Sequence, residues 1–317
     1  MVKKVLLVIV VLLVLGGGAF FARSKGYLFK NSKNVNTGST SNGKSDTPQQ
    51  YINFGGDYSF LVPEDYVVDD SSLPGAQLIT KKDEKLEVKT LDEIYGKGVI
   101  AIQTFSPALT DEESFKNYIN KTLLKAIEES LKGKSEVIFG KEGGSTTATI
   151  KTSVNGKLVR IQYILNADKP VIIASGAENS AYKTIFGSLA VASKNNKEFT
   201  NIQNAIMTCS SLLKNRMSED LYRLGSKAFK EQTTLDKLKS SLESASVALD
   251  TNMSVSGGVL NNNQFFGSLL FTKPAAKSSE QARSAVGAIN FEQEDGQWKM
   301  SGITLPGKEA FDPPKEE

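Results

Sequence analysis

Few side chains in this sequence are suited to catalysis or metal binding. The 317 residues include no histidine and one cysteine, Cys209, so the commonest general base and the commonest metal ligand are missing. A single cysteine excludes an internal disulfide and a thiolate metal cage. Cys209 lies on an apolar helical stripe, which predicts a buried, unreactive thiol, with an intermolecular disulfide as the alternative. We expect no enzymatic activity, no cofactor and no metal ion.

Two serine–lysine pairs are the main catalytic alternative. Ser180 precedes Lys183 and Ser211 precedes Lys214, each by three residues. On a helix this spacing places the amine beside the hydroxyl, as in some acyl-transfer enzymes. An envelope hydrolase or acyltransferase would use such a dyad. The S-D-N and K-T-G motifs that accompany it are absent, which favours chance spacing.

Two further patterns are better explained without a ligand. Gly302-x-x-x-x-Gly307-Lys308 is followed by Glu309, where a phosphate loop needs Ser or Thr to hold Mg²⁺. The acids at 69–70 and 111–113 lack the regular spacing of a calcium loop. The second group falls in the first turn of a predicted helix, where the helix dipole favours negative charge.

The N-terminus predicts a membrane anchor. After a short tail of residues 1–4, the run Val5 to Ala22 is apolar. As a helix it would measure about 27 Å, close to the hydrocarbon thickness of a bilayer. We interpret residues 5–22 as an uncleaved transmembrane signal-anchor in contact with membrane lipid. A removed secretory signal is the alternative.

The charge distribution bears on orientation and on partners. Residues 1–50 carry seven basic residues and one acidic residue, although the whole chain has a formal charge of only +3. The remainder offers no basic stripe for nucleic acid. Four basic residues between 23 and 33 follow the span, which taken literally favours a cytoplasmic C-terminus. We nevertheless expect the C-terminal domains outside the cytoplasm, with a cytoplasm-facing membrane adaptor as the alternative.

Composition divides the rest of the chain. Residues 23–50 form a flexible polar tether, because 31–50 contain a single apolar residue, Val35. A polar stretch at 193–197 then predicts a hinge between two domains, 51–192 and 198–306. A disordered tail is expected at 307–317.

The first domain is expected to combine short strands with one long helix. Strands are predicted at 59–62, 98–105 and 171–174, and a short helix at 180–189. Alternating apolar residues flank Asn155-Gly156, which predicts a hairpin over 146–165. The long helix begins at Thr110, with Glu113 completing a capping box. Its apolar face comprises Phe115, Ile119, Ala126, Ile127 and Leu131.

The second domain begins with helices and ends with strands, so the fold class is α+β. One helical stripe contains Phe199, Ile202, Ile206, Cys209, Leu213 and Met217. Ser218 and Thr233 begin two further helices, and Leu235, Leu238 and Leu242 form the inner face of the last. Strands are predicted at 247–256, 264–272 and 283–305. The last folds at Asp295-Gly296, which pairs Gln293 with Trp298 and Phe291 with Met300.

Two family resemblances follow from these segments. Residues 51–192 resemble PsbP-like domains, through the sequence from Tyr58 to Tyr66, the single long helix, and the strand at 171–176 followed by a terminal helix. Residues 197–306 resemble the nuclear transport factor 2-like superfamily, through helices followed by strands that end in the segment 294–300. These resemblances imply an antiparallel sheet and helix sandwich, followed by a cone-shaped domain with helices on a curved antiparallel sheet. They also imply non-catalytic binding roles.

The second resemblance directs attention to one set of aromatic and apolar residues. We expect Trp298 to pack in the core of this domain. The alternative is a ligand pocket, whose wall would be formed by Trp298, Phe291, Met300, Tyr222 and Phe229. The sequence as a whole predicts a membrane-anchored extracytoplasmic binding or accessory protein. Its expected partners are membrane lipid and an unidentified envelope protein or small apolar ligand, and not nucleic acid.

Overall fold

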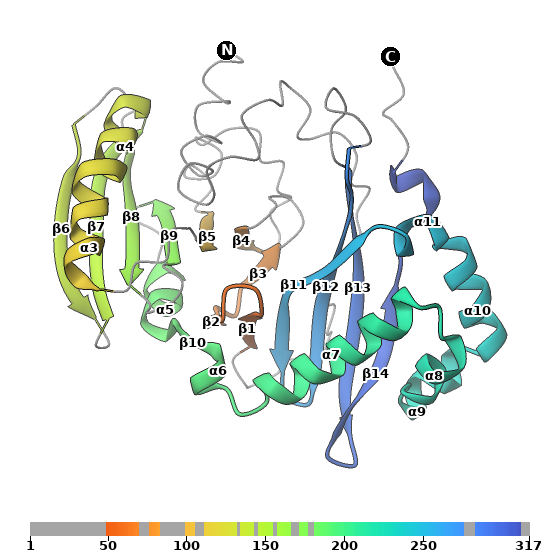
Figure 1. The fold of residues 1–317 in the computed structure, drawn as a ribbon. Coiled ribbons are helices and arrows are strands. Elements are labelled where there is room, and N and C mark those ends of the chain that lie inside the picture. The colour runs from red at the N-terminus through yellow and green to blue at the C-terminus, as the bar shows by residue number, and fades with distance from the viewer. Residues whose placement is uncertain are drawn as a thin grey trace. The chain divides into compact units, whose positions relative to one another are not determined.

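The fold is mixed α+β, with antiparallel sheets and packed helices, as the sequence predicts (Figure 1). A computed structural model describes residues 49–69, 76–82, 99–104, 111–131, 134–142, 145–154, 157–165, 171–176, 181–275 and 283–311. The predicted anchor at 5–22 lies outside these ranges. None of the helices within them is long and apolar enough to span a bilayer.

The contacts divide the chain into two units. In the described ranges, unit 1 comprises residues from Leu61 to Leu189, and unit 2 comprises 49–60 together with 190–311. The first domain is predicted to begin at residue 51, whereas unit 1 begins at Leu61. Strands β1 (Gln49–Asn53) and β2 (Tyr58–Val62) instead pair into the sheet of unit 2. Nothing in the local sequence marks this pairing, because the partner strand lies about 200 residues further along.

Unit 1 contains a seven-stranded antiparallel sheet with the order β3-β4-β5-β9-β8-β7-β6. Its strands are β3 (Tyr66–Asp69), β4 (Ala76–Lys81), β5 (Ile100–Thr104), β6 (Glu136–Glu142), β7 (Ser145–Val154), β8 (Lys157–Leu165) and β9 (Val171–Gly176). The short helix α5 (Ala181–Ser188) follows the last of these strands. The hairpin predicted over 146–165 is confirmed, since Ile150 pairs with Ile161 and Val154 pairs with Lys157.

The N-cap of the long helix in unit 1 lies one residue later than predicted. It comprises α3 (Glu112–Tyr118), the π-helical segment η1 (Ile119–Leu123) and α4 (Leu124–Leu131). Asp111 caps it, because its carboxylate accepts a hydrogen bond from the backbone N–H of Ser114 at 2.7 Å. The cap predicted at Thr110 is therefore wrong. A carboxylate at this position both accepts the free N–H and complements the helix dipole.

The π-helical segment follows from the spacing of the buried residues. Phe115, Ile119, Leu123 and Ile127 are all fully buried and recur at exactly four residues. In an ideal α-helix each four-residue step overshoots one turn by about 40°, so such a stripe drifts around the helix. A wider turn at 119–123 reduces that drift and keeps all four side chains on the sheet. The predicted face omitted Leu123, and the side chains of Ala126 and Leu131 are not among those described.

Unit 2 contains a second seven-stranded antiparallel sheet with the order β10-β2-β1-β11-β12-β13-β14. Its C-terminal strands are β11 (Asn252–Asn261), β12 (Gln264–Lys273), β13 (Arg283–Glu294) and β14 (Gln297–Thr304), and β10 (Ala190–Val191) lies at the far edge. The predicted hairpin is confirmed, with Gln293 opposite Trp298 and Phe291 opposite Met300. Asp295 and Gly296 both have positive φ, at 52° and 74°, as a type I′ turn requires.

Helices pack on one face of this sheet. They are α6 (Ala192–Asn195), α7 (Phe199–Lys214), α8 (Ser218–Arg223), α9 (Lys227–Gln232), α10 (Leu235–Ser244) and α11 (Ser246–Leu249), followed after the strands by the 3-10 helix η2 (Lys308–Phe311). The predicted hinge at 193–197 overlaps α6, whose Ala192 is fully buried in the core of unit 2.

The predicted stripe of α7 is confirmed from Phe199 to Leu213, all of whose members are buried. The prediction that Met217 is the last member of this stripe is wrong, because Met217 lies beyond the end of α7 and its side chain is 44% exposed. Arg216 has a φ of 55°, which ends the helical path before Met217 can join the stripe.

Two other boundaries differ from prediction. Helix α10 is capped by Thr234, whose hydroxyl accepts from the N–H of Lys237, and not by Thr233. Residues 246–249 are helical, so the strand predicted at 247–256 starts at Asn252 and extends to Asn261.

The core of unit 2 joins helices and strands from both ends of the chain. Ile52 of β1 lies in the same hydrophobic cluster as Ile206 of α7, Leu242 of α10, Phe265 of β12 and Ile289 of β13. All five side chains are at most 3% exposed. The N-terminal strand is therefore an integral part of this core.

Candidate functional site

The five residues predicted to line a pocket lie together in unit 2. Phe291, Met300 and Phe229 are at most 4% exposed and belong to its hydrophobic core cluster. Tyr222 and Trp298 are partly buried and pack against the same cluster. The rings of Tyr222 and Phe229 are 6.3 Å apart between centroids. The structure thus brings the predicted set together as part of a packed core, and ligand binding to it stays a prediction.

Trp298 also has a specific polar partner. Its indole Nε1–H donates to Oε2 of Glu198 at 2.8 Å, and Nε2 of Gln293 donates to the same oxygen at 3.1 Å. Glu198 is the N-cap residue of α7. This bond attaches β14 to the start of α7, so the polar group of the half-buried tryptophan serves the packing of unit 2.

The single cysteine is where the sequence predicts it. Cys209 is 1% exposed on the inner face of α7 and has no disulfide partner. Burial raises the pKa of its thiol to about 12. Because the thiolate is the reactive species, this thiol is unreactive near neutral pH.

No serine–lysine dyad is present among the residues that the structure describes. Ser211 and Lys214 both lie on the exposed side of α7. The hydrogen bond at Ser211 uses its backbone carbonyl oxygen, which accepts from Nδ2 of Asn215 at 2.9 Å. Ser180 lies outside the described residues, and Lys183 is exposed on α5.

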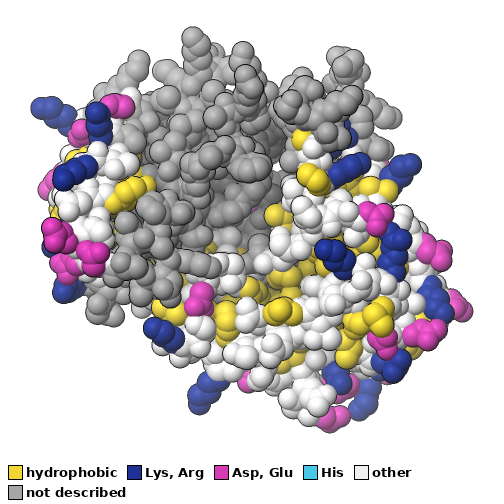
Figure 2. Space-filling view, in the orientation of Figure 1, with side chains coloured by type: hydrophobic (Ala, Val, Ile, Leu, Met, Phe, Trp, Pro, Cys, Tyr) yellow, Lys and Arg dark blue, Asp and Glu magenta, His cyan; other side chains and the backbone are white. Residues whose placement is uncertain are grey.

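The described residues contain no metal-binding group of three or more histidine, cysteine or acidic side chains. Gly302 lies within β14, and Lys308 begins the four-residue 3-10 helix η2, so the two glycines do not enclose a loop that leads into an α-helix. On the face drawn in Figure 2, the coloured basic and acidic side chains are interspersed. Of the acidic pair at 69–70, which lacks the spacing of a calcium loop, Asp69 is the last residue of β3 and Asp70 lies outside the described ranges.

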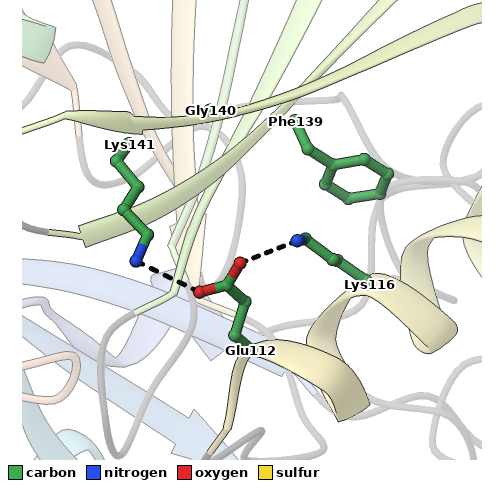
Figure 3. A pocket seen from close by; sticks show the side chains of 5 residues that line it. All are labelled: Glu112, Lys116, Phe139, Gly140 and Lys141. Carbon is green, nitrogen blue, oxygen red and sulfur yellow. Dashed lines mark hydrogen bonds and ion pairs between the residues drawn. The ribbon is translucent and has the colours of Figure 1, made fainter.

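The most distinctive polar arrangement lies in unit 1, between α3 and the edge strand β6. A shallow depression of about 170 Å³ is lined by Glu112, Lys116, Phe139, Gly140 and Lys141 (Figure 3). Nζ of Lys116 is 2.7 Å from Oε1 of Glu112, and Nζ of Lys141 is 3.3 Å from Oε2. Two ammonium groups therefore share one carboxylate, which leaves a net positive charge in the depression.

The neighbours of Glu112 keep its carboxylate ionised. The hydrogen bond from Lys116 and then that from Lys141 hold the pKa of Glu112 below its usual value. The hydroxyl of Thr146 on β7 also donates to Oε2, at 3.4 Å. Nζ of Lys116 lies 5.8 Å from the ring centroid of Phe139, within the range of a cation–π contact.

Local structure explains why these side chains meet. Glu112 is in the first turn of α3, which Asp111 caps, and Lys116 follows one turn later on the same side. Phe139 and Lys141 alternate with Ile138 and Gly140 along β6, so both point to the face that carries the helix. The i,i+4 pair is readable from sequence. Lys141 has no such signal, because its approach depends on how the helix packs on the sheet.

The sequence matches no protein-family model and none of the curated proteins with which it was compared. Among solved structures, a Bacteroides thetaiotaomicron protein is similar over 80% of this chain and 88% of its own, with 10% identity and a TM-score of 0.36. The Saccharomyces cerevisiae Ran-binding protein Mog1p is similar over 46% of this chain and 96% of its own, with 12% identity and a TM-score of 0.30. Neither TM-score is high enough to support an argument about fold or function.

Proposed function

We propose that this protein is a single-pass membrane protein whose two α+β units act as a non-catalytic binding or accessory module outside the cytoplasm. The observation that carries the proposal is the apolar run of residues 5–22 followed directly by a polar segment and then by two folded units. This order is typical of a domain held near a membrane by a flexible tether.

The chemistry of the described residues supports a binding role over catalysis. The one thiol is buried with a pKa of about 12, and Ser211 and Lys214 are both exposed on α7. The family resemblances support the same proposal. Unit 2 has helices α7 to α10 followed by the antiparallel strands β11 to β14, the order that the nuclear transport factor 2-like superfamily shares.

Topology is the first test. Protease added to intact spheroplasts should digest the segment 49–311, while lysis should be needed to expose the residues before position 5. A control protein of the cytoplasm must survive in the same sample. Full protection of 49–311 until lysis would place the units inside and favour a membrane adaptor.

A second test separates binding from catalysis. Chemical crosslinking in isolated membranes should capture a partner through one of the two units. An acylating probe should leave Ser211 unlabelled, and a Ser211→Ala variant should be as active as the parent protein in crosslinking. Stoichiometric labelling of Ser211, abolished by Lys214→Ala, would establish the hydrolase alternative.

A further inference from the structure

One edge of the unit 1 sheet has no partner strand among the described residues. β6 is the last strand in the sheet order and pairs on one side with β7, from Glu136 opposite Lys151 to Glu142 opposite Ser145. Figure 1 shows it as the outermost strand of that sheet. An unpaired strand edge presents N–H and C=O groups that an extended peptide can match.

The composition of β6 leaves its centre open to such pairing. Ile138, in the middle of the strand, is 42% exposed, which is unusual for a large apolar side chain in the described residues. Val137 and Phe139 on either side are half-buried. The charges that protect edge strands from pairing are confined to the ends, at Glu136, Lys141 and Glu142.

The depression beside β6 indicates which side chain a partner would place there. Lys116 and Lys141 are 43% and 68% exposed, and Glu112 neutralises only one of their two charges. Each ammonium group carries three N–H donors, and one contact with Glu112 occupies a single donor. A second carboxylate would therefore find both opposite charge and free donors.

We propose that unit 1 binds an extended, acidic peptide segment, which adds as a further strand along β6 and places a carboxylate beside Lys141 and Lys116. This inference rests on the proposed binding function and specifies the chemistry of the partner.

The two faces of β6 define the sequence pattern of that partner. Side chains directly opposite each other across paired strands share a face. A partner residue opposite Ile138 therefore lies on the face away from α3, where an apolar side chain would cover the exposed Ile138. Partner residues opposite Phe139 or Lys141 lie on the helix face, where Asp or Glu fits. Apolar and acidic residues should thus alternate in the partner.

The test uses the full-length protein in detergent micelles and three labelled ten-residue peptides. The first alternates valine with glutamate, the second alternates valine with lysine, and the third is the acidic peptide with every backbone amide N-methylated, which blocks both of its edges. Fluorescence anisotropy should show binding of the acidic peptide only. N-methylation removes strand hydrogen bonds while keeping the charges, so it separates strand addition from simple electrostatic attraction.

Charge-reversal variants locate the site. Lys141→Glu should weaken binding of the acidic peptide by about tenfold or more. Lys125→Glu is the matched control, because Lys125 is 73% exposed and lies 3.9 Å from the carboxylate of Glu129 on α4. It should leave the affinity unchanged. Both variants replace exposed side chains, and circular dichroism verifies that each is folded.

Each contrary result overturns the proposal. Equal binding of the N-methylated peptide would exclude strand addition, and equal binding of the lysine peptide would exclude the charge preference. Dimerisation abolished by Ile138→Lys would show that a second copy of the chain occupies the edge. Absence of binding by the acidic peptide would refute the β6 site, while the spheroplast result would still decide the proposed function separately.

Discussion

Ile52 offers a direct test of how the chain is divided between the two units. It lies on β1, more than 130 residues before the rest of unit 2, yet it is fully buried in that unit's core. Replacement by alanine should destabilise unit 2 specifically. A chain whose units followed the predicted boundary at residue 51 would instead lose stability in unit 1.

The magnitude follows from the surroundings of Ile52. Removing three buried carbon groups costs about 2.4 kcal/mol at ~0.8 kcal/mol each. The space left behind adds to this cost, because Ile52 lies opposite Gly258, which has no side chain to move into it. A Cβ on Gly258 would collide with the ring of Phe265, which shows how closely the layers approach there. We expect a loss of about 3–4 kcal/mol, within the range measured for buried isoleucine.

The single tryptophan provides the assay. Trp298 lies on β14 of unit 2, so its fluorescence reports unfolding of that unit. With a urea dependence of about 2 kcal/mol per molar, Ile52→Ala should lower the fluorescence midpoint by roughly 1.5–2 M.

Ile79→Ala is the matched control, because Ile79 is equally buried but lies on β4 of unit 1. Ile79→Ala should leave unchanged the urea midpoint that Trp298 fluorescence reports. It should lower the stability of unit 1, measured by circular dichroism. An unchanged midpoint in Ile52→Ala, or an equal shift in both variants, would refute the assignment of β1 to unit 2.

Three further predictions concern the polar contacts and the limits of unit 2. Trp298→Phe should cost about 1–2 kcal/mol because the bond to Glu198 is lost, and Glu198→Gln should cost less because an acceptor remains; chemical denaturation followed by circular dichroism measures both. Burial raises the pKa of Cys209 to about 12, against an ordinary value of 9.0. The unfolded chain therefore loses this proton first, so stability should fall as pH rises above about 9, and Cys209→Ala should remove the contribution of the cysteine to that fall. Thiol labelling should likewise be slow until urea unfolds unit 2. The isolated segment 197–311 should give no cooperative melt, because it lacks β1, β2 and β10, whereas 45–311 should melt cooperatively in calorimetry.

Local patterns in the sequence predict most elements correctly. The alternation around Asn155-Gly156 and the Asp295-Gly296 turn give both hairpins with the observed register. The stripe from Phe199 to Leu213 gives the buried face of α7. In each case the residues that form the pattern lie within about 20 positions of one another. The apolar side chains that recur at the helix or strand period are also the ones that fill the core.

The errors arise where distant segments decide the structure. The polar residues at 193–197 resemble a linker, yet Ser193 donates its backbone N–H and hydroxyl to the carboxylate of Asp57, more than 130 residues earlier. Likewise, β1 reads as the start of the first domain because its partner β11 follows an entire intervening unit. The local sequence of a strand does not indicate which distant strand will pair with it.

The candidate site shows the same limit. Glu112 falls in the acidic group that the sequence predicts for the first turn of a helix, and Lys116 follows it at the four-residue spacing of a helical pair. Lys141 joins them only because α3 packs beside β6. The five residues singled out in unit 2 all lie in or against its hydrophobic core, where Phe291 and Met300 are fully buried. Ligand binding to them stays a prediction.

The position of β1 also determines how mechanical load would travel through the protein. The polar segment that precedes Gln49 enters unit 2 through a strand held on both sides, by β2 and by β11. Unit 1 leaves from β2 and returns at β10, and these two strands are paired, with Ser59 opposite Ala190. Tension between the N-terminal segment and a partner held by unit 2 would therefore pass along strands of unit 2 and bypass unit 1. A partner held by unit 1 would instead pull on the β2–β10 pair, which has only two residue pairs and would separate first.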